Sequence, residues 1–384
     1  MQLKNGVHFA YCTNIHPGDD WAQTFASLKN CTLGVRDRVC RDKPFAIGLR
    51  LSDRASRELI QPEALREFQR WLKAENCYIF TINGFPFGQF HGGSVKEQVF
   101  APDWSSPERL DFTNRLFDLQ ASLLPEGMEG SVSTLPGSFK GFHCDHSRID
   151  VIMENLWRCI DHIAELSQRT GHTFHLGVEP EPFGLFENTT ETLAFFAGMA
   201  ERRPGDARLG LHLGINYDAC HFAIQFEDAE QSLTEFRQHN IRLSKIHLSS
   251  ALRVVPNVGN LSQLQAFAED TYLHQVVART KNGAFLRYHD LPVALEKNAP
   301  AEEWRIHFHV PLYASARAGL GTTIDHTKGV LDWLAANPGA CGHLEMETYT
   351  WAVLPPELKS ASVIDQIVRE YEWILPQLTA RGLR

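Results

Sequence analysis

The sequence predicts a (β/α)8 barrel, the TIM-barrel fold, and three observations carry this prediction. Short apolar runs of the kind that form buried strands alternate with helical patterns along the whole chain. Eight such units follow one another, and 384 residues suffice for one barrel with an insertion. No linker, low-complexity tract or repeat divides the chain. The same alternation also permits an open, doubly wound sheet with a second domain, which is the structural alternative.

The first half of the chain supplies four strand–helix units. Each helical stretch places apolar residues on one face, as Leu65, Phe68 and Leu72 illustrate. We expect strands at Val7–Thr13, Phe45–Leu51, Tyr78–Ile82 and Ser131–Leu135. We expect their helices from Trp21 onward and over Pro62–Ala74, Arg109–Leu124 and Ile149–Gln168.

The second half supplies four further units. We expect strands at Phe174–Glu179, Leu211–Tyr217, Ile241–Leu248 and His343–Thr348. A cap at Asn188 or Thr189 begins a helix that runs to Ala200. We expect the remaining helices over Ala229–His239, Thr323–Ala335 and Ser362–Leu378.

Residues 251–322 separate the seventh and eighth strands and are far too many for an ordinary βα loop. Within them we expect a helix over Leu261–Thr280 and a hairpin with arms Phe285–Leu295 and Arg305–Tyr313. Long βα loops lie at the active face of a barrel and often exclude water from it. We therefore predict that 1–384 is a single domain whose insertion forms a lid over the barrel mouth.

The composition restricts the class of partner. The net charge is −9 and the chain has no run rich in Lys or Arg, which argues against nucleic acid. No apolar stretch is as long as a membrane span, and the first residues lack a signal-peptide pattern. The eight cysteines form no CxxC pair. We expect a cytoplasmic protein that acts on a small molecule. The oligomer that we include as a possibility is a homodimer.

Polar side chains close four consecutive strands, at the barrel face where TIM-barrel active sites lie. In chain order they are Glu179 with Glu181, Asp218 with His221, His247, and Glu345 with Glu347. Carboxylates that converge in an enclosed mouth repel one another, and a divalent cation removes that repulsion. Carboxylates with one imidazole suit Mn, Zn, Co or Mg, whereas the imidazole disfavours calcium.

Each Glu-x-Glu pair places both carboxylates on one strand face, because side chains alternate along a strand. Depth along the strand favours Glu179 and Glu347 as metal ligands beside Asp218 and His247. Glu181 and Glu345 are then left to support the ligands or to bind substrate. Taken singly, an Asp-x-x-His is more often a helix cap and a strand histidine more often part of the core. The four positions together at one rim favour the metal site.

Loops after other strands add candidates for substrate binding, because binding residues concentrate on loops that a rigid scaffold positions. His16, Asn83 and Lys140 follow the first, third and fourth strands. His309, which alternates with His307 in the predicted hairpin, is a candidate to close over the site.

The ordered set of Glu179, Asp218-x-x-His221, His247 and Glu347 resembles the xylose isomerase-like superfamily, which includes sugar isomerases, ketose epimerases and endonuclease IV-type enzymes. Longer segments are similar to the EboE metabolite-traffic family. They are YCTNIHPG (11–18), FTINGFPFGQFHG (80–92), VKEQVFAPDW (95–104), GVEPEP (177–182) and HLEMETYTW (343–351). The second resemblance implies a place in the handling of secondary-metabolite precursors.

The resemblance implies a metal-dependent isomerase or epimerase acting on a sugar-like or polyol metabolite. The metal would bind adjacent carbonyl and hydroxyl oxygens and stabilise an enediolate. Glu179 and Glu347 would exchange protons on opposite faces of the substrate carbon, and His221 would orient a substrate oxygen. The alternative is a non-catalytic metabolite-binding or traffic protein that uses the same pocket. A metal-dependent nuclease, as some relatives are, is disfavoured by the acidic charge.

Overall fold

Eight parallel strands close into a barrel in the computed structural model, which describes residues 1–316 and 319–384. Every neighbouring pair in the sheet runs parallel, and a parallel bridge between Cys12 and Gly48 joins the first strand to the second. In spatial order the strands are β1 (His8–Tyr11), β13 (His343–Met346), β7 (Arg242–Leu248), β6 (Leu213–Asp218), β5 (Phe174–Val178), β4 (Gly130–Thr134), β3 (Cys77–Asn83) and β2 (Phe45–Arg50). The predicted barrel is therefore confirmed.

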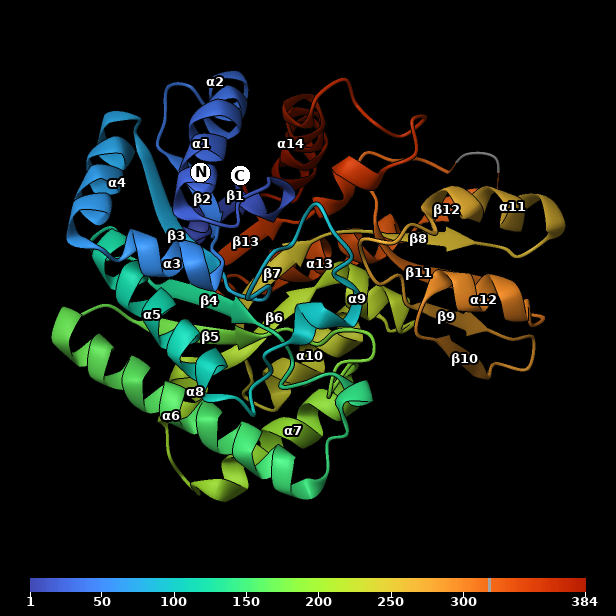
Figure 1. Ribbon diagram of the computed structural model, residues 1–384, viewed down its shortest axis with the longest axis horizontal. Helices are drawn as coiled ribbons and strands as arrows, with labels where there is room; N and C mark the ends of the chain where they lie inside the picture. The colour runs from blue at the N-terminus through green and yellow to red at the C-terminus, as the bar shows by residue number, and fades with distance from the viewer. Residues whose placement is uncertain (317–318) are drawn as a thin grey trace.

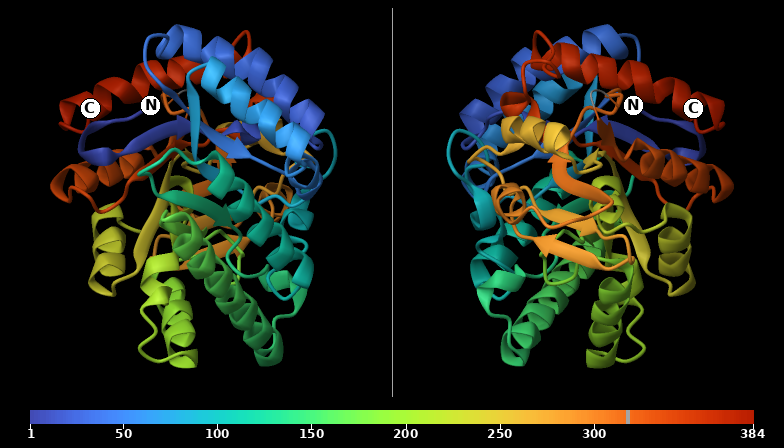
Figure 2. Two further views of the ribbon diagram at one scale, coloured as in Figure 1. Left: turned by 90° about the vertical axis from the view of Figure 1, so that its left-hand side faces the viewer. Right: turned by 90° about the vertical axis from the view of Figure 1, so that its right-hand side faces the viewer.

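Helices surround the barrel, as the three views in Figures 1 and 2 show. They are α1 (Trp21–Ser27), α2 (Leu33–Val39), α3 (Asp53–Leu59), α4 (Pro62–Ala74), α5 (Pro107–Leu123), α6 (His146–Thr170), α7 (Thr189–Arg202), α8 (Arg208–His212), α9 (Ala219–Ile224), α10 (Ala229–Gln238), α13 (Ile324–Ala336) and α14 (Val363–Ala380). Asp145, Asn188 and Ser362 cap α6, α7 and α14 through their side chains. Within the described ranges no helix is both long and apolar enough to cross a membrane.

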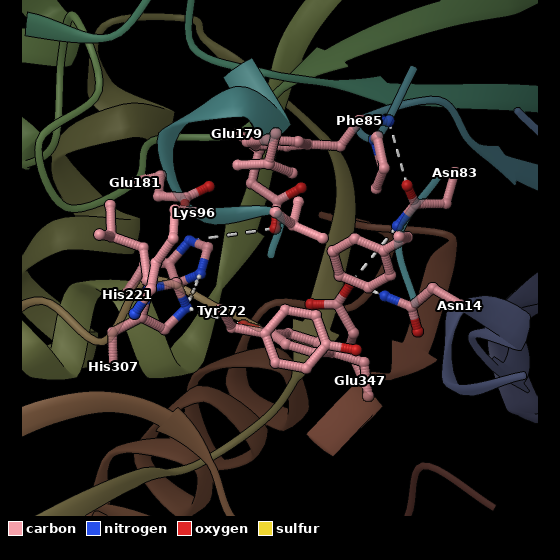
Figure 3. A pocket seen from close by; sticks show the side chains of 16 residues that line it. Asn14, Asn83, Phe85, Lys96, Glu179, Glu181, His221, Tyr272, His307 and Glu347 are labelled. Atoms are coloured by element: carbon pink, nitrogen blue, oxygen red, sulfur yellow. Dashed lines mark hydrogen bonds and ion pairs between the residues drawn. The ribbon is translucent and has the colours of Figure 1, made fainter. Parts of the chain in front are cut away.

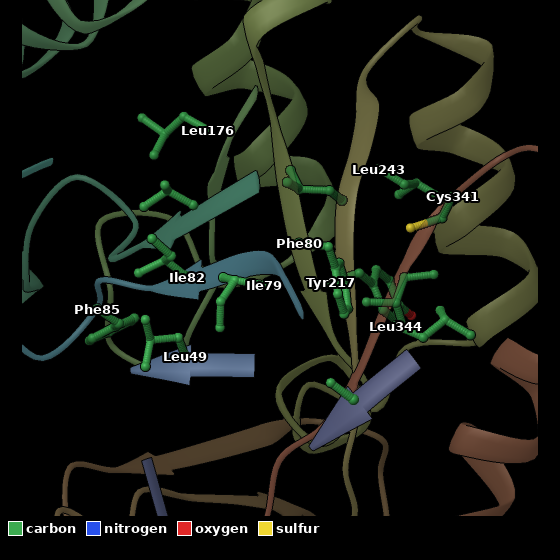
Figure 4. Close-up of a cluster of buried hydrophobic side chains, with 14 of the residues drawn as sticks. Leu49, Ile79, Phe80, Ile82, Phe85, Leu176, Tyr217, Leu243, Cys341 and Leu344 are labelled. Atoms are coloured by element: carbon green, nitrogen blue, oxygen red, sulfur yellow. The ribbon is translucent and has the colours of Figure 1, made fainter. Parts of the chain in front are cut away.

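The barrel strands are buried on both faces, because one face fills the barrel and the other packs under the helices. Figure 4 shows part of this core, in which Leu49, Ile82 and Leu176 come from three different strands. The barrel interior is polar in part. Ser131 donates to Thr81 at 2.7 Å, and the ring of His343 lies 2.8 Å from Ser131 Oγ.

The insertion forms a second, antiparallel sheet, which lies beside the barrel in Figure 1. Its strands, in spatial order, are β10 (Phe285–Tyr288), β9 (Val276–Arg279), β11 (Glu303–His309), β8 (Ala251–Val254) and β12 (Leu320–Thr322). Its helices are α11 (Val258–Gln263) and α12 (Leu291–Lys297). A hydrophobic cluster that includes Trp304, Ile306 and Phe308 packs within it. Residues 317 and 318 of the predicted insertion lie outside the described residues.

Two predictions inside the insertion were wrong. The expected helix over 261–280 is short and gives way to β9, whose β-branched residues pair with β10 and β11. The expected hairpin arms do not pair with each other, because β11 pairs with β9 and β8. The first arm ends at Tyr288, and Asp290 then caps α12. That residues 1–384 fold as one unit stays a prediction.

Glu370 on α14 is a buried carboxyl that holds the segment after β13, and it gives a prediction for stability. It accepts hydrogen bonds from Leu312 N at 3.0 Å and Thr348 Oγ1 at 2.7 Å. Burial raises its pKa to about 7 from an ordinary 4.5. The folded state therefore holds this proton more tightly, so the carboxyl favours folding below pH 4.5 and loses that contribution as the pH rises through 7.

We expect Glu370→Gln to remove this pH dependence, because the amide keeps an acceptor without a charge. Relative to the wild type, the variant should gain about 3 kcal/mol of unfolding free energy between pH 4.5 and pH 8. Urea unfolding at the two pH values measures the gain. The exposed Glu372 on the same helix provides the control, since Glu372→Gln should show no such gain. An equal response of both variants would contradict the prediction.

Candidate metal centre

Four side chains from neighbouring strand ends converge at the mouth of the barrel. Glu179 follows β5, Asp218 ends β6, His247 lies on β7 and Glu347 follows β13. One ligand atom of each lies within 4.8 Å of the others, and all four residues are buried. His247 Nδ1 is 3.1 Å from Glu179 Oε1, 3.4 Å from Asp218 Oδ2 and 3.2 Å from Glu347 Oε2. The structure thus brings together the four ligands expected from the sequence.

Strand register explains the convergence. Asp218 pairs with His247 across β6 and β7, and Glu345 pairs with His247 across β13 and β7. Parallel strands lie about 5 Å apart, so side chains at matching depth meet inside the barrel. Glu347 follows Glu345 by two residues, so its side chain is on the same face of the strand. It approaches the same centre from a position nearer the mouth of the barrel.

Asp218 is both a helix cap and a candidate ligand. Its Oδ1 accepts from Cys220 N at 2.7 Å and from Ser249 Oγ at 2.6 Å, which caps α9. Its Oδ2 is buried and has no hydrogen-bond partner within the described part of the chain. A buried carboxylate oxygen without a partner is costly unless a cation satisfies it.

The donor set fits a divalent ion. Three carboxylates face one imidazole in a site with no exposure to solvent at Asp218 or His247. Burial alone would lower the pKa of His247, but the charges of Glu347 and Glu179 outweigh it and raise that pKa well above its ordinary value. A cation is therefore favoured at this point, and a metal ion supplies two charges where a proton supplies one. Oxygen donors with one nitrogen suit Mn, Zn, Co or Mg.

Glu345 lies beneath His247 in the barrel interior. Its Oε2 accepts from His247 Nε2 at 2.9 Å and from Lys245 Nζ at 2.6 Å. Burial disfavours its charge, yet Lys245 and His247 outweigh burial and lower the pKa of Glu345 to about 2. Because Nε2 donates to this carboxylate, Nδ1 is the nitrogen that faces the other carboxylates. A side chain on Gly48 would collide with Glu345 Oε1, so glycine is needed there.

We expect Glu345→Gln to weaken metal binding by about 10- to 100-fold, because partners that orient a ligating histidine contribute that much. The amide still accepts from one donor, but it no longer balances the charge of Lys245 or fixes the imidazole tautomer. Competition titration with a chelating dye measures the affinity. Glu187→Gln changes a buried carboxylate outside the described cavity lining and should bind metal normally. Unchanged affinity in Glu345→Gln would contradict this role.

A partly open cavity lies against two of the four residues, Glu179 and Glu347 (Figure 3). Its volume is about 50 Å³, which is room for a few water molecules. Figure 3 shows His221 and His307 on one side and Asn14 and Asn83 on the other. The lining residues are Asn14, Asn83, Phe85, Pro86, Phe90, Val95, Lys96, Val99, Glu179, Glu181, His221, Tyr272, Leu273, His307, Glu347 and Tyr349. Three of them, Tyr272, Leu273 and His307, belong to the insertion, which therefore lies on the C-terminal face of the barrel.

The candidates for substrate binding divide into two groups. Asn83, Glu181 and His221 line the cavity. Burial, followed by the charges of Glu179 and Glu347, raises the pKa of Glu181 well above its ordinary value. Asn83 Nδ2 lies 3.3 Å from Glu347 Oε1, so it also holds a ligand in place.

The other candidates lie away from the described cavity lining, each for a local reason. His16 bonds to the Tyr11 hydroxyl at 3.0 Å inside the core. Lys140 pairs with Glu187 and Glu191 near the surface. His309 is buried behind the cavity wall, and its Nδ1 lies 2.8 Å from the Glu347 carbonyl oxygen. Glu345 lies in the barrel interior, where it supports His247.

Sequence reasoning missed Asn14 and Tyr272. Asn14 Nδ2 donates to Glu347 Oε1 at 2.7 Å from the loop after β1, beside the predicted His16. The signal that could have identified it is its place in the loop, because Asn14 lies two residues before His16, which was already a candidate for substrate binding. Tyr272 fell within the helix that was wrongly expected, so its position at the mouth carried no signal in the sequence.

No family model and no curated protein matches the sequence. Among solved structures, a xylose isomerase domain protein from Alicyclobacillus acidocaldarius subsp. acidocaldarius is 11% identical, with a TM-score of 0.50 over 98% of this chain and 99% of that one. A D-tagatose 3-epimerase-like protein is 12% identical, with a TM-score of 0.50 over 97% of this chain and 98% of that one. The resemblance to the EboE family stays a prediction. Identities this low show the fold alone, and that fold is the TIM barrel.

Proposed function

We propose that the protein is a metal-dependent isomerase or epimerase that acts on a sugar-like or polyol metabolite. The observation that carries the proposal is that a candidate metal site and a cavity adjoin each other. Glu179, Asp218, His247 and Glu347 converge at the barrel mouth, and two of them, Glu179 and Glu347, also line the cavity. Carboxylates that face both a metal position and a substrate cavity are suited to moving protons at a bound substrate.

The four converging residues would hold the metal, which is Mn, Zn, Co or Mg. When bound, such an ion polarises adjacent carbonyl and hydroxyl oxygens of a substrate and so acidifies the carbon between them. Glu179 and Glu347 approach the cavity from different strands, β5 and β13. One carboxylate can take a proton from that carbon and the other can return one to the opposite face.

The protein's own polar contacts fix one carboxylate more firmly than the other. Asn14 and Asn83 direct their amides at Glu347 Oε1, at 2.7 and 3.3 Å. Glu179 Oε1 has His247 Nδ1 as its partner at 3.1 Å. Glu179 is therefore the freer of the two to change orientation as a proton is transferred.

A sugar has to enter through the mouth of this cavity. Tyr272 and Leu273 of the insertion line the cavity without belonging to the barrel. We infer that this part of residues 251–322 opens as a lid and excludes water when it closes. The resemblance to the EboE family supports a substrate drawn from secondary metabolism, and the acidic charge supports a small molecule over nucleic acid.

Proton exchange with solvent tests the proposal across a range of candidate substrates. The protein, loaded with Mn²⁺, Co²⁺ or Zn²⁺, is incubated in D2O with a panel of ketoses, aldoses and their phosphates. We expect NMR to show deuterium at a carbon next to a carbonyl, and loss of that exchange after chelation. Binding of a panel member without exchange would favour the alternative, a non-catalytic metabolite-binding protein, and would overturn the proposed reaction.

A further inference from the structure

We propose that His91 is a positioning residue that links closure of the lid to the orientation of Glu347. Its Nδ1 lies 2.7 Å from the Tyr272 hydroxyl of the insertion, and its Nε2 lies 2.6 Å from the Asn14 carbonyl oxygen. The Asn14 side chain in turn donates to Glu347 Oε1 at 2.7 Å (Figure 3). Tyr272, His91 and Asn14 thus form a relay from the insertion to the carboxylate. The inference rests on the proposed function, because that function assigns proton transfer to Glu347.

The hydrogen bonds of the relay run in one direction. A backbone carbonyl only accepts, so Nε2 of His91 carries the hydrogen that reaches the Asn14 oxygen. Burial lowers the pKa of His91 to about 4 from an ordinary 6.5, and the neutral ring leaves Nδ1 without a hydrogen. Nδ1 therefore accepts from the Tyr272 hydroxyl, whose own pKa is raised by burial. One imidazole joins the insertion to the loop after β1 and uses both of its nitrogens to do so.

Asn14 is the partner of Glu347 that most needs such support. The other donor, Asn83, ends β3, so the barrel sheet holds it, and its bond to Glu347 Oε1 is longer, at 3.3 Å. Asn14 lies instead in the short turn Thr13–Ile15. His91 holds the carbonyl oxygen of this turn and so fixes the residue whose amide makes the shorter bond. Without that hold the Asn14 amide can shift, and the orientation of Glu347 becomes less well defined.

The other end of the relay belongs to the part of the insertion that covers the mouth. Thr271 O accepts from Val95 N at 2.7 Å, so this segment closes onto the loop after β3, which also carries His91. The Tyr272 ring packs beside it in a small cluster of buried hydrophobic residues. When the segment lifts, the Tyr272 hydroxyl leaves His91. Glu347 is therefore held most firmly when the lid is closed and water is excluded.

The relay makes proton transfer depend on closure. A misplacement of about 1 Å can lower a rate by about 10²-fold, so a carboxylate that is fixed only under the closed lid acts only there. Coupling between two events is reciprocal. Whatever fixes Glu347 must therefore also favour the closed lid, and a metal ion bound by Glu347 should hold Tyr272 in place.

Hydrogen exchange of the backbone amides of residues 269–273 tests this coupling, with Zn²⁺ as the probe. We expect Zn²⁺ to slow the exchange in the wild type by about 3- to 10-fold, since the coupling cannot exceed what one hydrogen bond contributes. Tyr272→Phe removes only the hydroxyl, so Zn²⁺ should bind without slowing the exchange. His91→Leu should behave likewise. His91→Gln should restore the effect, because an amide can both donate and accept. Tyr313→Phe removes a hydroxyl that bonds to Ser360 and should keep it.

Crystal structures of the metal-free wild type and of His91→Leu give a readout that needs neither metal nor substrate. We expect Asn14 Nδ2 to contact Glu347 Oε1 in the wild type and to leave it in the variant. An unchanged contact, or equal protection by Zn²⁺ in the wild type and Tyr272→Phe, would overturn the relay and leave the proposed function intact. Loss of the contact, together with no solvent exchange on any sugar, would support the relay and overturn the proposed function. A wild type that binds no Zn²⁺ also overturns that function, and the crystal comparison then decides on the relay.

Discussion

Asp218→Asn is expected to weaken metal binding at the four-ligand site by at least ~100-fold, more than the loss of a supporting residue. Asp218 Oδ1 is held by Cys220 N and Ser249 Oγ, so the amide oxygen of the variant takes that position. Its NH2 group is then turned toward the carboxylates, where it can donate but cannot bind a metal. Asparagine also caps helices, so α9 should keep its first turn.

The metal-free protein should respond in the opposite direction. Asp218→Asn removes one buried anion and gives its neighbours a donor, so the metal-free variant should unfold at a higher temperature than the metal-free wild type. Added metal stabilises the wild type in proportion to its binding and should stabilise the variant little. Asp228→Asn makes the same change at the exposed N-cap of α10 and should leave metal affinity unchanged. Wild-type affinity in Asp218→Asn would exclude Asp218 as a ligand.

Local sequence patterns suffice for the barrel, because each strand–helix unit carries its own periodicity. The expected helix over 62–74 coincides with α4, where Pro62 begins the helix and its apolar residues repeat every three or four positions. The convergence of Asp218 and His247 also follows from sequence. Once both residues end parallel strands that are neighbours in the chain, register brings them together.

The insertion and the finer contacts of the site depend on partners that are distant in the sequence. β8 pairs with β11 some fifty residues later, and no local pattern specifies that partner. The buried pair of Lys245 and Glu345 is a similar case. Alternation places Glu345 and Glu347 on one face, but only the packed barrel shows that Glu345 meets Lys245 beneath His247. The meeting of His221 with His307 likewise requires the insertion to be in place.

Glu179→Gln is expected to lower solvent exchange at the substrate carbon by about 10²- to 10⁴-fold while metal stays bound, because a glutamine cannot carry the proton. The oxygen of Glu179 is not fixed by amide donors, so the amide of the variant can turn its oxygen toward the metal position. Glu347→Gln should behave differently. Asn14 and Asn83 hold its oxygen, which leaves the NH2 group facing His247, so this variant should lose both metal and exchange.

Deuterium incorporation and bound metal, measured on the same samples, separate these outcomes. Glu187→Gln changes a buried glutamate that pairs with Lys140 outside the described cavity lining, and it should keep both properties. Exchange at the wild-type rate in metal-loaded Glu179→Gln would show that Glu179 carries no proton, whatever its part in metal binding. Loss of metal from Glu179→Gln but not from Glu347→Gln would reverse the assignment, because it would mean that the carboxylate held by Asn14 and Asn83 is the one that moves.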